Sequence, residues 1–439
     1  MWTRCTGARS RPPRRSERPS FHGEPMRDVR MRGFREHTAV ERALEVLERR
    51  IQRLADELVP IAEAVGRVAV EPVRARISVP HFVRAAMDGY ALLGEATAGA
   101  AALAPVELAL VGASFPGRPH AGAIRRGEAV RITTGAPVPE GADAVLVAER
   151  AEEGAGRDGA AVVRAREPVP SGKHVAAIGE DVLEGAEVVP AGRRLRPQDV
   201  GVLASTGVAE VRVVRRPSVR ILITGDELLP PGSAPSGACI VDTNSLVLSA
   251  LARRDGAEDI AVAYVPDRRE AVRSALEAAG GDVVLVSGGS SVGSEDHAPL
   301  VLAELGEVVV HGVAMRPAKP AGFGFLPGGR AVFLLPGNPV SCLCAYEFFA
   351  GPSIRALGGL PRAWPHRRRR CVVASEIVSQ PGRVDYVRVR VEGDRVFPIA
   401  TSGASILSST TRADGVVIVQ AEEAVIGEGA EVEVLLYDA

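Results

Sequence analysis

The chain has 439 residues, of which 46% are apolar and only 4% aromatic, and its net charge is −1. A chain of this length is too long for one ordinary domain, so we expect three or four. The near-zero charge argues against a nucleic-acid binder that works through bulk charge, and no apolar run has the ~18 residues that a membrane span needs. The five cysteines lack paired spacing and indicate reduced thiols, so we expect a cytoplasmic protein.

The first part of the chain changes from a polar leader to a helical pattern. Residues 1–37 are rich in Arg, Pro and Ser and have no hydrophobic period, which predicts a disordered leader. The period that follows places Val40, Leu44, Leu47 and Ile51 on one face of a helix. The folded part of the chain is therefore expected to begin at this helix.

Short apolar runs dominate the next segment. Between residues 76 and 165, Val/Ala/Leu runs alternate with Gly and Pro, which predicts a compact β-rich domain. Residues 166–212 contain further Pro and Gly turns, strand-like runs and a helix expected at 197–205.

Strand-like and helical runs alternate regularly over residues 213–361, which predicts an α/β domain with a parallel sheet. The strands are expected at 219–224, 260–265, 282–287, 308–313 and 331–336, and the helices at 245–254, at 268–279 and in two runs that end at 305 and 349. A basic linker at 358–370 then leads to short strands with Gly turns. We expect residues 362–439 to form a small β-barrel.

Two of the expected strands end in turns that suit anions. SGGSSVG (287–293) and PGNP (336–339) each follow an apolar strand and precede a helical pattern. Unpaired N–H groups at a helix N-terminus hold phosphates, and open α/β sheets bind ligands at the carboxyl ends of their strands. The candidate phosphate-binding residues are Ser287, Gly288, Gly289, Ser290, Gly293, Pro336, Gly337, Asn338 and Ser341. Taken singly, each turn is equally well explained as a capped helix after a buried strand.

Carboxylates lie next to these turns. TGDEL (224–228) places Glu227 at the end of another strand, and Asp296 is expected in the first turn of a helix that begins near Ser294. Near phosphates, such carboxylates suit Mg²⁺. Asp242 and Asn244 in CIVDTN are weaker candidates. Acids in surface turns are common, so the simple solvated alternative stays open.

The segment VAMRPAKP (313–320) carries two cations, Arg316 and Lys319, between prolines that stiffen the chain. Cations held in this way form an anion clamp, although exposed Arg and Lys are often only solvated. No Ser-His-Asp set, zinc spacing or Cys-His pair stands out. Catalysis is therefore expected to rest on positioning, a metal ion and electrostatics.

Six motifs together carry a resemblance that none carries alone. AMDGYA, RITTGAPVPEGADAV, ITGDEL, SGGSSVGSED, MRPAKP and LLPGNPVS occur in this order over residues 38–439. The chain thereby resembles the MoeA/gephyrin E-domain family, the molybdopterin molybdenumtransferases of molybdenum cofactor synthesis. The resemblance implies a multidomain α/β plus β fold. Its four parts are an elongated domain from the segments 38–75 and 166–212, an inserted β-rich domain, a MogA-like parallel α/β domain and a C-terminal β-barrel.

The resemblance also implies an activity and partners. Family members transfer molybdate onto the dithiolene of adenylylated molybdopterin, with a divalent cation such as Mg²⁺, and release AMP. They form homodimers, receive their substrate from a MogA-like molybdopterin adenylyltransferase, and supply molybdoenzymes or cofactor-maturation proteins. Molybdate and tungstate are not distinguished by any motif.

By motif, several roles carry over to this chain. Asp88 and Thr134 are expected to reach the site from the partner chain. Glu227 and Asp296 are expected to serve metal binding and adenylate cleavage. The turns cradle phosphates, and the pair Arg316 and Lys319 attracts molybdate and the pterin phosphate. Asp267 falls where the family carries an acid.

This sequence departs from the family pattern at several positions. Ala318 replaces a usual Gly and is expected to restrict the backbone, because Gly alone tolerates positive φ cheaply. The other departures are Ser290 for Val, Gly312 for a basic residue, Arg316 for Lys and Ala404 for Ser.

The sequence leaves two other functions open. An adenylyltransferase acting on molybdopterin and ATP would explain residues 213–361 alone. A non-catalytic scaffold would leave the acids Glu227 and Asp296 without a purpose.

Overall fold

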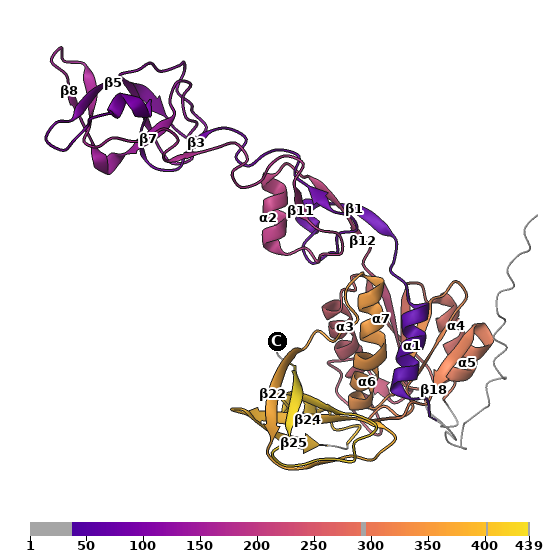
Figure 1. The fold of residues 1–439 in the computed structure, drawn as a ribbon. Helices are drawn as coiled ribbons and strands as arrows, with labels where there is room; N and C mark the ends of the chain where they lie inside the picture. Colours follow the sequence, from indigo (N-terminus) through magenta and orange to yellow (C-terminus); the bar gives the residue numbers. More distant parts are fainter. Residues whose placement is uncertain (1–36, 291–295, 401–402, 438–439) are drawn as a thin grey trace, which may run out of the picture.

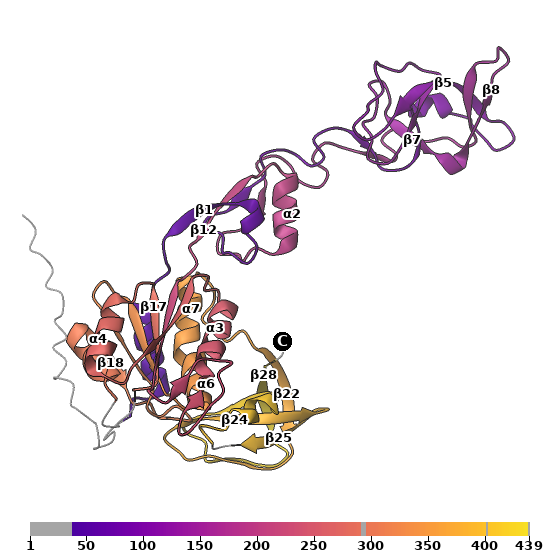
Figure 2. The ribbon, with the colours of Figure 1, turned by 180° about the vertical axis from the view of Figure 1, so that it is seen from behind.

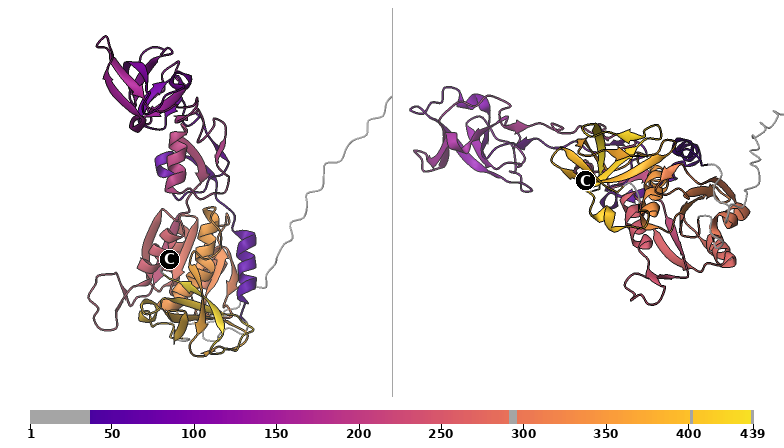
Figure 3. Two further views of the ribbon diagram at one scale, coloured as in Figure 1. Left: turned by 60° about the vertical axis from the view of Figure 1, so that its left-hand side comes forward. Right: turned by 90° about the horizontal axis from the view of Figure 1, so that it is seen from below.

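The computed structural model describes residues 37–290, 296–400 and 403–437. Figure 1 shows an elongated molecule in which a β-rich inserted unit lies at one end and an α/β unit with a small barrel lies at the other. A slender elongated unit lies between them, and the views in Figures 2 and 3 show the same order. None of the helices in the described ranges is long and apolar enough to cross a membrane.

The elongated unit is built from two distant stretches of the chain. Strand β1 (Asp56–Pro60) pairs antiparallel with β12 (Glu210–Val214), and β2 (Val73–Arg74) pairs with β11 (Glu187–Val189). Helix α2 (Pro197–Ser205) covers them, as its sequence predicts. Asp199 accepts the Arg196 backbone N–H at 2.9 Å and so caps the start of this helix.

The inserted unit is an open six-stranded sheet in the order β7-β4-β6-β5-β9-β8. Its strands are β4 (Gly89–Leu92), β5 (Val106–Ser114), β6 (Glu128–Ile132), β7 (Ala144–Val147), β8 (Ala151–Ala155) and β9 (Ala161–Ala165). A short pair, β3 (Arg84–Ala85) with β10 (Val175–Ala176), joins this unit to the elongated one.

The α/β unit contains a six-stranded sheet in the order β16-β13-β17-β21-β20-β18. The strands are β13 (Val219–Thr224), β16 (Ile260–Val265), β17 (Val283–Ser287), β18 (Glu307–His311), β20 (Gly322–Phe325) and β21 (Ala331–Leu335). Successive residues point to opposite faces: Ile221 and Ile223 pack in the core that includes α3, whereas Leu222 packs in the core that includes α4 and α5.

Helices cover both faces of this sheet. They are α1 (Val40–Arg50), α3 (Asn244–Arg254), α4 (Arg269–Ala278), α5 (Ala298–Leu305), α6 (Pro339–Ala345), the π-helical turn η4 (Tyr346–Ala350) and α7 (Gly351–Leu357). The last run therefore continues beyond its expected end at residue 349. The sheet and its two helical layers match the expected α/β architecture.

Strand β20 was not predicted from the sequence. It runs antiparallel to both β21 and β18, so the sheet is parallel except for this strand. Its glycines are needed because the backbones approach closely: a Cβ on Gly324 would lie 1.9 Å from the Glu307 carbonyl oxygen. Glycine is depleted in strands, which is why the pattern GFGF gave no strand signal.

Helix α1 differs from expectation in two ways. Val40, Leu47 and the neighbouring Ile51 are buried as predicted, but Leu44 is 37% exposed and Ala43 takes its place in the core. The helix packs in the core of the α/β unit rather than in that of the elongated unit. The prediction that the whole of 38–75 belongs to the elongated domain is therefore wrong for this helix.

The C-terminal unit is a closed five-stranded barrel in the order β24-β25-β22-β28-β26, with β26 pairing back to β24. The strands are β22 (Arg367–Val373), β24 (Val384–Glu392), β25 (Arg395–Ala400), β26 (Gly415–Val419) and β28 (Glu431–Leu436). The expected linker 358–370 is thus shorter than predicted, because its four final arginines already belong to β22. Strand β19 (Met315–Arg316) of the α/β unit adds to the barrel by pairing with β24.

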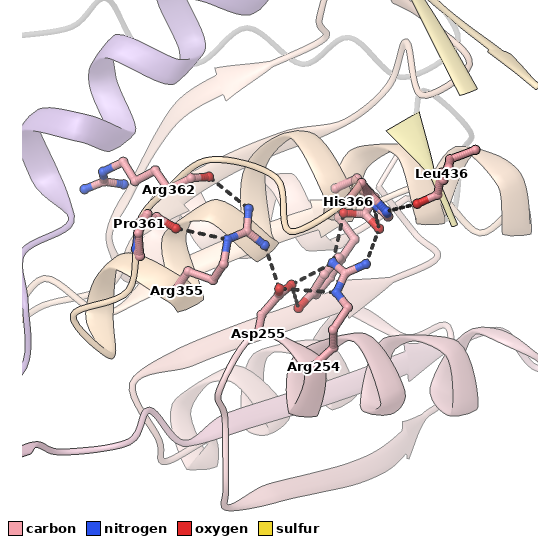
Figure 4. Close-up of polar contacts among 9 residues, drawn as sticks. Arg254, Asp255, Arg355, Pro361, Arg362, His366 and Leu436 are labelled. Atoms are coloured by element: carbon pink, nitrogen blue, oxygen red, sulfur yellow. Dashed lines mark hydrogen bonds and ion pairs between the residues drawn. The ribbon is translucent and has the colours of Figure 1, made fainter. Parts of the chain in front are cut away.

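A buried ion network fastens the barrel to the α/β unit (Figure 4). Asp255 accepts hydrogen bonds from Arg355 at 2.6 Å and from Arg254 at 2.9 Å. Glu347 accepts from Arg254 at 2.6 Å and lies 3.3 Å from His366. Burial alone would raise the pKa of Glu347, but the bonds from His366 and Arg254 lower it. The other nitrogen of His366 lies 3.0 Å from the Leu436 carbonyl oxygen of the last barrel strand.

Candidate active site

Three parallel strands bring their carboxyl ends to one edge of the sheet. Strands β13, β17 and β21 are neighbours in register and end at Thr224, Ser287 and Leu335. The turns that follow them line one cavity of about 790 Å³, which we call the turn cavity. Its lining includes these predicted residues: Glu227, Asp242, Asn244, Asp267, Ser287, Gly288, Gly289, Ser290, Asp296, Pro336, Gly337 and Asn338. Gly293 lies outside the described residues.

The glycine-rich turn after β17 packs tightly on its neighbours. Gly288 has φ +92°, and a Cβ there would lie 2.4 Å from the Thr224 carbonyl oxygen. Its N–H donates to the Leu335 carbonyl oxygen at 3.1 Å, and the Ser290 hydroxyl donates to the same oxygen at 3.0 Å. Only glycine fits this position without strain, so the turn is fixed in place by its backbone.

Asn244 joins two of the turns. Its side-chain amide donates to the Ser287 hydroxyl at 2.9 Å and to the Gly337 carbonyl oxygen at 2.8 Å. This weak candidate from the sequence thus sets the spacing of the two predicted phosphate cradles.

Asp242 has a structural role at the start of α3. It accepts the Asn244 N–H at 2.9 Å and the Ser245 N–H at 3.3 Å, and the Tyr264 hydroxyl donates to it at 3.0 Å. A carboxylate that meets the first N–H groups of a helix stabilises that helix.

The other acids of the turn cavity are more accessible. Glu227 is exposed, and Asp267 and Asp296 are half-buried. The backbone N–H of Asp267 donates to Asp226 at 3.1 Å, and that of Asp226 donates back at 3.2 Å. The prediction that Asp296 lies in the first turn of a helix is wrong, because α5 begins only at Ala298. Asp296 instead lines the cavity from the segment before the helix.

His311 supports the turn cavity from behind. Its Nε2 lies 2.9 Å from the Ser290 carbonyl oxygen. Burial lowers the pKa of His311 below its usual value, so the neutral ring donates Nε2–H to this carbonyl near neutral pH.

A second cavity, of about 1,020 Å³, adjoins the first and shares Pro320, Pro336 and Asn338 with it. We call it the cation cavity. Its described lining residues include no Asp or Glu, but do include four basic or titratable nitrogen groups and a predicted serine: His37, Arg316, Lys319, Arg383 and Ser341. The two cavities therefore differ sharply in charge.

The two arginines of the cation cavity are anchored from the barrel. Arg316 and Arg383 both pair with Asp385, which is 0% exposed and also accepts the Ser379 hydroxyl at 2.8 Å. Lys319, in contrast, is exposed and has no carboxylate within ion-pair distance in the described chain. Burial, and then the charge of Lys319, lower the pKa of His37.

Sequence patterns missed Arg383 and His37. Arg383 follows a Pro-Gly turn in the barrel, and His37 is the last residue of the segment 1–37 that was predicted to be a disordered leader. Neither has a neighbouring motif, so only the fold reveals that they share a cavity with Lys319.

Ala318 bears out the concern about a missing glycine. It has φ +80°, and its N–H donates to the Ser341 hydroxyl at 3.3 Å. Non-glycine residues are uncommon in this region, so the loop that carries Lys319 holds backbone strain.

Two predicted catalytic residues lie elsewhere. In the inserted unit, Asp88 accepts the Thr134 N–H at 2.6 Å and its hydroxyl at 2.8 Å, and these bonds lower the pKa of Asp88. Figure 1 shows this unit at the opposite end of the molecule from the α/β unit. Within one chain, Asp88 and Thr134 do not join the cavities.

Comparison with known families covers almost the whole described chain. Residues 38–207 match the model of the MoeA N-terminal region (domain I and II), residues 220–356 match the "Probable molybdopterin binding domain", and residues 370–437 match the MoeA C-terminal region (domain IV). The first match spans helix α1, the elongated unit and the inserted unit, the second lies in the α/β unit, and the third lies in the barrel (Figure 1).

Comparison with individual proteins gives the same result as comparison with the family models. The molybdopterin molybdenumtransferase of Haemophilus influenzae is 32% identical over 86% of this chain and 93% of its own length. Molybdopterin molybdenumtransferase 2 of Mycobacterium tuberculosis is 35% identical over 75% and 82%. The crystal structure of the molybdopterin biosynthesis MoeA protein from Pyrococcus horikosii superposes with a TM-score of 0.77 at 34% identity, covering 92% of this chain and all of that one. The chain belongs to the MoeA family, the molybdopterin molybdenumtransferases of molybdenum cofactor biosynthesis.

Proposed function

We propose that the chain transfers molybdenum from molybdate onto the dithiolene sulfurs of adenylylated molybdopterin and releases AMP. The observation that carries this proposal is the contact between the turn cavity and the cation cavity. Strand-end turns suit a phosphorylated ligand, and a cavity lined by cations suits an oxyanion. The reaction needs these two substrates side by side.

In the turn cavity, the chain's own work is positioning. The backbone of Ser287–Ser290 and the turn at Asn338 hold the phosphate groups of the adenylylated substrate. Asn244 keeps these two cradles at a fixed distance through its bonds to Ser287 and Gly337. A substrate held at both cradles loses the freedom that otherwise makes reaction slow.

The acids of the turn cavity fit Mg²⁺. We assign the ion to Glu227 and Asp296, and to Asp242 only as a further candidate because its oxygens already cap α3. Mg²⁺ commonly binds through one or two carboxylates together with substrate phosphates. The described residues contain no cage of three or more His, Cys, Asp or Glu side chains, and such a site needs none. Bound Mg²⁺ supplies neutralisation of the phosphate charge.

In the cation cavity, Lys319 is the group that attracts molybdate. Arg316 and Arg383 add positive charge from a fixed frame, because the buried Asp385 holds both guanidinium groups. Arg316 also has a buried Nε with no hydrogen-bond partner in the described chain.

Asp88 and Thr134 can act at this site only from a second copy of the chain. We therefore propose a homodimer in which the inserted unit of one protomer reaches the turn cavity of its partner. Mixing the inactive variants Asp88→Asn and Asp296→Asn tests this, since each mixed dimer would hold one intact site. Restored AMP release supports the dimeric site, and no restoration refutes it.

The substrates define the neighbours of this reaction. An adenylyltransferase of the MogA type must supply the adenylylated molybdopterin, and molybdoenzymes or cofactor-maturation proteins must take the product. We place the reaction in the cytoplasm, in line with the unpaired thiols of Cys239, Cys342, Cys344 and Cys371.

The deciding experiment measures AMP release from adenylylated molybdopterin with Mg²⁺, with and without molybdate. Release that depends on molybdate supports the transferase. Binding without release favours a scaffold, and consumption of ATP to form adenylylated molybdopterin favours an adenylyltransferase. The barrel supports the transferase over the adenylyltransferase, because it supplies Arg383 to the cation cavity.

A further inference from the structure

The joint between the elongated unit and the α/β unit contains a third cavity, of about 330 Å³, which we call the joint cavity. None of its lining residues lines the turn cavity or the cation cavity. It is lined by four arginines, Arg67 and Arg194 from the elongated unit, Arg216 from the connecting segment and Arg253 from the end of α3. Residues of two units thus face one small space.

Two of the four guanidinium groups, those of Arg194 and Arg216, come close to one point of this cavity. A Cβ placed on Gly66 would lie 3.9 Å from Nη2 of Arg194 and 3.9 Å from Nη2 of Arg216. The described lining residues include no Asp or Glu. Like charges that line one cavity repel one another, so an anion is favoured there.

Nearby carboxylates compensate only half of the charge. Glu57 pairs with Arg67, and Glu258 pairs with Arg216. Neither Arg194 nor Arg253 has a carboxylate within ion-pair distance in the described ranges. Four positive charges less two negative charges leave two positive charges at the joint cavity.

Arg67 is the buried member of this arginine cluster. Its side chain is only 5% exposed, and it lines the joint cavity. Its Nη2 donates to the Val214 carbonyl oxygen at 3.1 Å, but its buried Nε has no hydrogen-bond partner in the described chain. Buried donors are nearly always satisfied, so the protein satisfies this guanidinium incompletely, but its Nε is too enclosed for an ion in the cavity to reach.

We propose that the joint cavity binds a tetrahedral dianion of the phosphate, sulfate or molybdate type. Such an ion matches the surplus of two positive charges and offers oxygens for the planar forks of several guanidinium groups. The joint cavity, at about 330 Å³, has room for one such ion with bridging water. Bound there, the ion links Arg67 and Arg194 of the elongated unit to Arg253 of the α/β unit, and so fixes the angle at which the elongated unit leaves.

The test is equilibrium dialysis of the full chain with ³²P-labelled inorganic phosphate at constant ionic strength. The joint variant, Arg194→Glu with Arg253→Glu, is expected to weaken phosphate binding at least tenfold. The matched control, Arg367→Glu with Arg370→Glu on exposed β22, has the same charge change and is expected to bind as the wild type does. All variants carry Lys319→Gln, which weakens binding in the cation cavity. The turn cavity and the two remaining arginines of the cation cavity are the same in the joint variant and in the control, so the difference in binding between these two variants reports the joint cavity.

Either result decides the proposal. Equal binding in the joint variant and the control overturns it, as does the absence of phosphate binding in the Lys319→Gln parent. Competition by unlabelled sulfate and molybdate then shows which dianion the cavity prefers. Because the assay needs no pterin substrate, its failure leaves the proposed transferase untouched.

Hydrogen exchange gives a second test, which stays informative even if the double variant folds poorly, because it uses only the wild type and a single variant. The Val214 N–H donates to Val68 at 2.9 Å, and the Arg215 N–H donates to Ala55 at 3.0 Å, both at the joint. Phosphate is expected to slow exchange of these two N–H groups in the wild type and not in the single variant Arg194→Gln. If phosphate does not alter the exchange of these N–H groups in the wild type, the proposed link between the elongated unit and the α/β unit is overturned.

Discussion

The turn cavity and the cation cavity share a wall but are built in opposite ways. The turn cavity is made by strand ends of one sheet, and its charged residues are acids on local motifs. The cation cavity is made where a loop of the α/β unit meets the barrel, and its charged residues come from distant segments. Local sequence motifs therefore form the turn cavity, whereas the contact between the α/β unit and the barrel forms the cation cavity. Their division of labour is the part of the proposal that mutations can test.

The largest expected effect is that of Asp296→Asn on AMP release. The amide keeps the shape of the carboxylate but loses the charge that suits Mg²⁺. We expect turnover to fall roughly a thousandfold, about 4 kcal/mol of transition-state stabilisation, while molybdate binding is unchanged. Single-turnover AMP release and molybdate dialysis measure the two quantities.

The control for this change is Glu304→Gln on the outer surface of α5, which does not line either cavity. It should leave both quantities unchanged. Unaltered turnover in Asp296→Asn would remove this residue from the mechanism, and a parallel loss of molybdate binding would show that the two cavities do not work separately.

The next effect concerns the frame of the cation cavity. Asp385→Asn leaves Arg316 and Arg383 around a neutral side chain in a buried site. Removing one partner of a buried ion pair costs about 3 kcal/mol or more, so we expect the free energy of unfolding to fall by that amount. Urea unfolding can be followed by the fluorescence of Trp364, whose ring lies 6.3 Å from that of Tyr386 on β24.

Asp394→Asn, in the exposed turn between β24 and β25, is the matched control and should change the free energy of unfolding by less than about 0.5 kcal/mol. If Asp385→Asn behaves like this control, the arginines need no anchor, and Asp385 does not stabilise the contact between the α/β unit and the barrel at the cation cavity.

Lys319→Gln is expected to have a smaller and more selective effect. It removes one exposed ammonium group while Arg316 and Arg383 remain. Hydrogen bonds to charged groups contribute about 2 kcal/mol, so the molybdate concentration for half-maximal AMP release should rise roughly 30-fold. Binding of adenylylated molybdopterin should not change.

Lys319→Arg keeps the positive charge and should recover most of the molybdate affinity. A loss of affinity for the adenylylated substrate in Lys319→Gln would show instead that this lysine serves the turn cavity.

The contrast between the cavities also explains what the sequence could predict. Strand β13 and helix α2 occupy their expected residues, and the turns after β17 and β21 meet as expected, because periodicity and turn chemistry act over a few residues. The motif identifies Arg316, but the residue that it pairs with, Asp385, lies 69 positions further along the chain. No local pattern carries such a contact.

Two errors have the same physical origin. Leu44 belongs to the apolar pattern of α1, but the helix presents Ala43 to the core because it packs on the α/β unit rather than beside β1. Strand β20 was missed because its glycines serve backbone approach between neighbouring strands. In both cases tertiary packing, rather than local preference, decides the outcome.

The smallest expected effect tests where backbone strain is stored. The turn cavity meets its positive φ angles with glycines, such as Gly288 at +92°, whereas the cation cavity uses Ala318 at +80°. An alanine in this region costs about 1 kcal/mol, so Ala318→Gly should raise the free energy of unfolding by roughly 0.5–1 kcal/mol. Ala321→Gly, at a buried position without positive φ, should lower it instead. If both changes destabilise the protein equally, Ala318 is held without strain by its neighbours. If only Ala318→Gly stabilises it, the cation cavity carries a strain that the turn cavity avoids, and molybdate affinity measured on the same variant shows whether that strain positions Lys319.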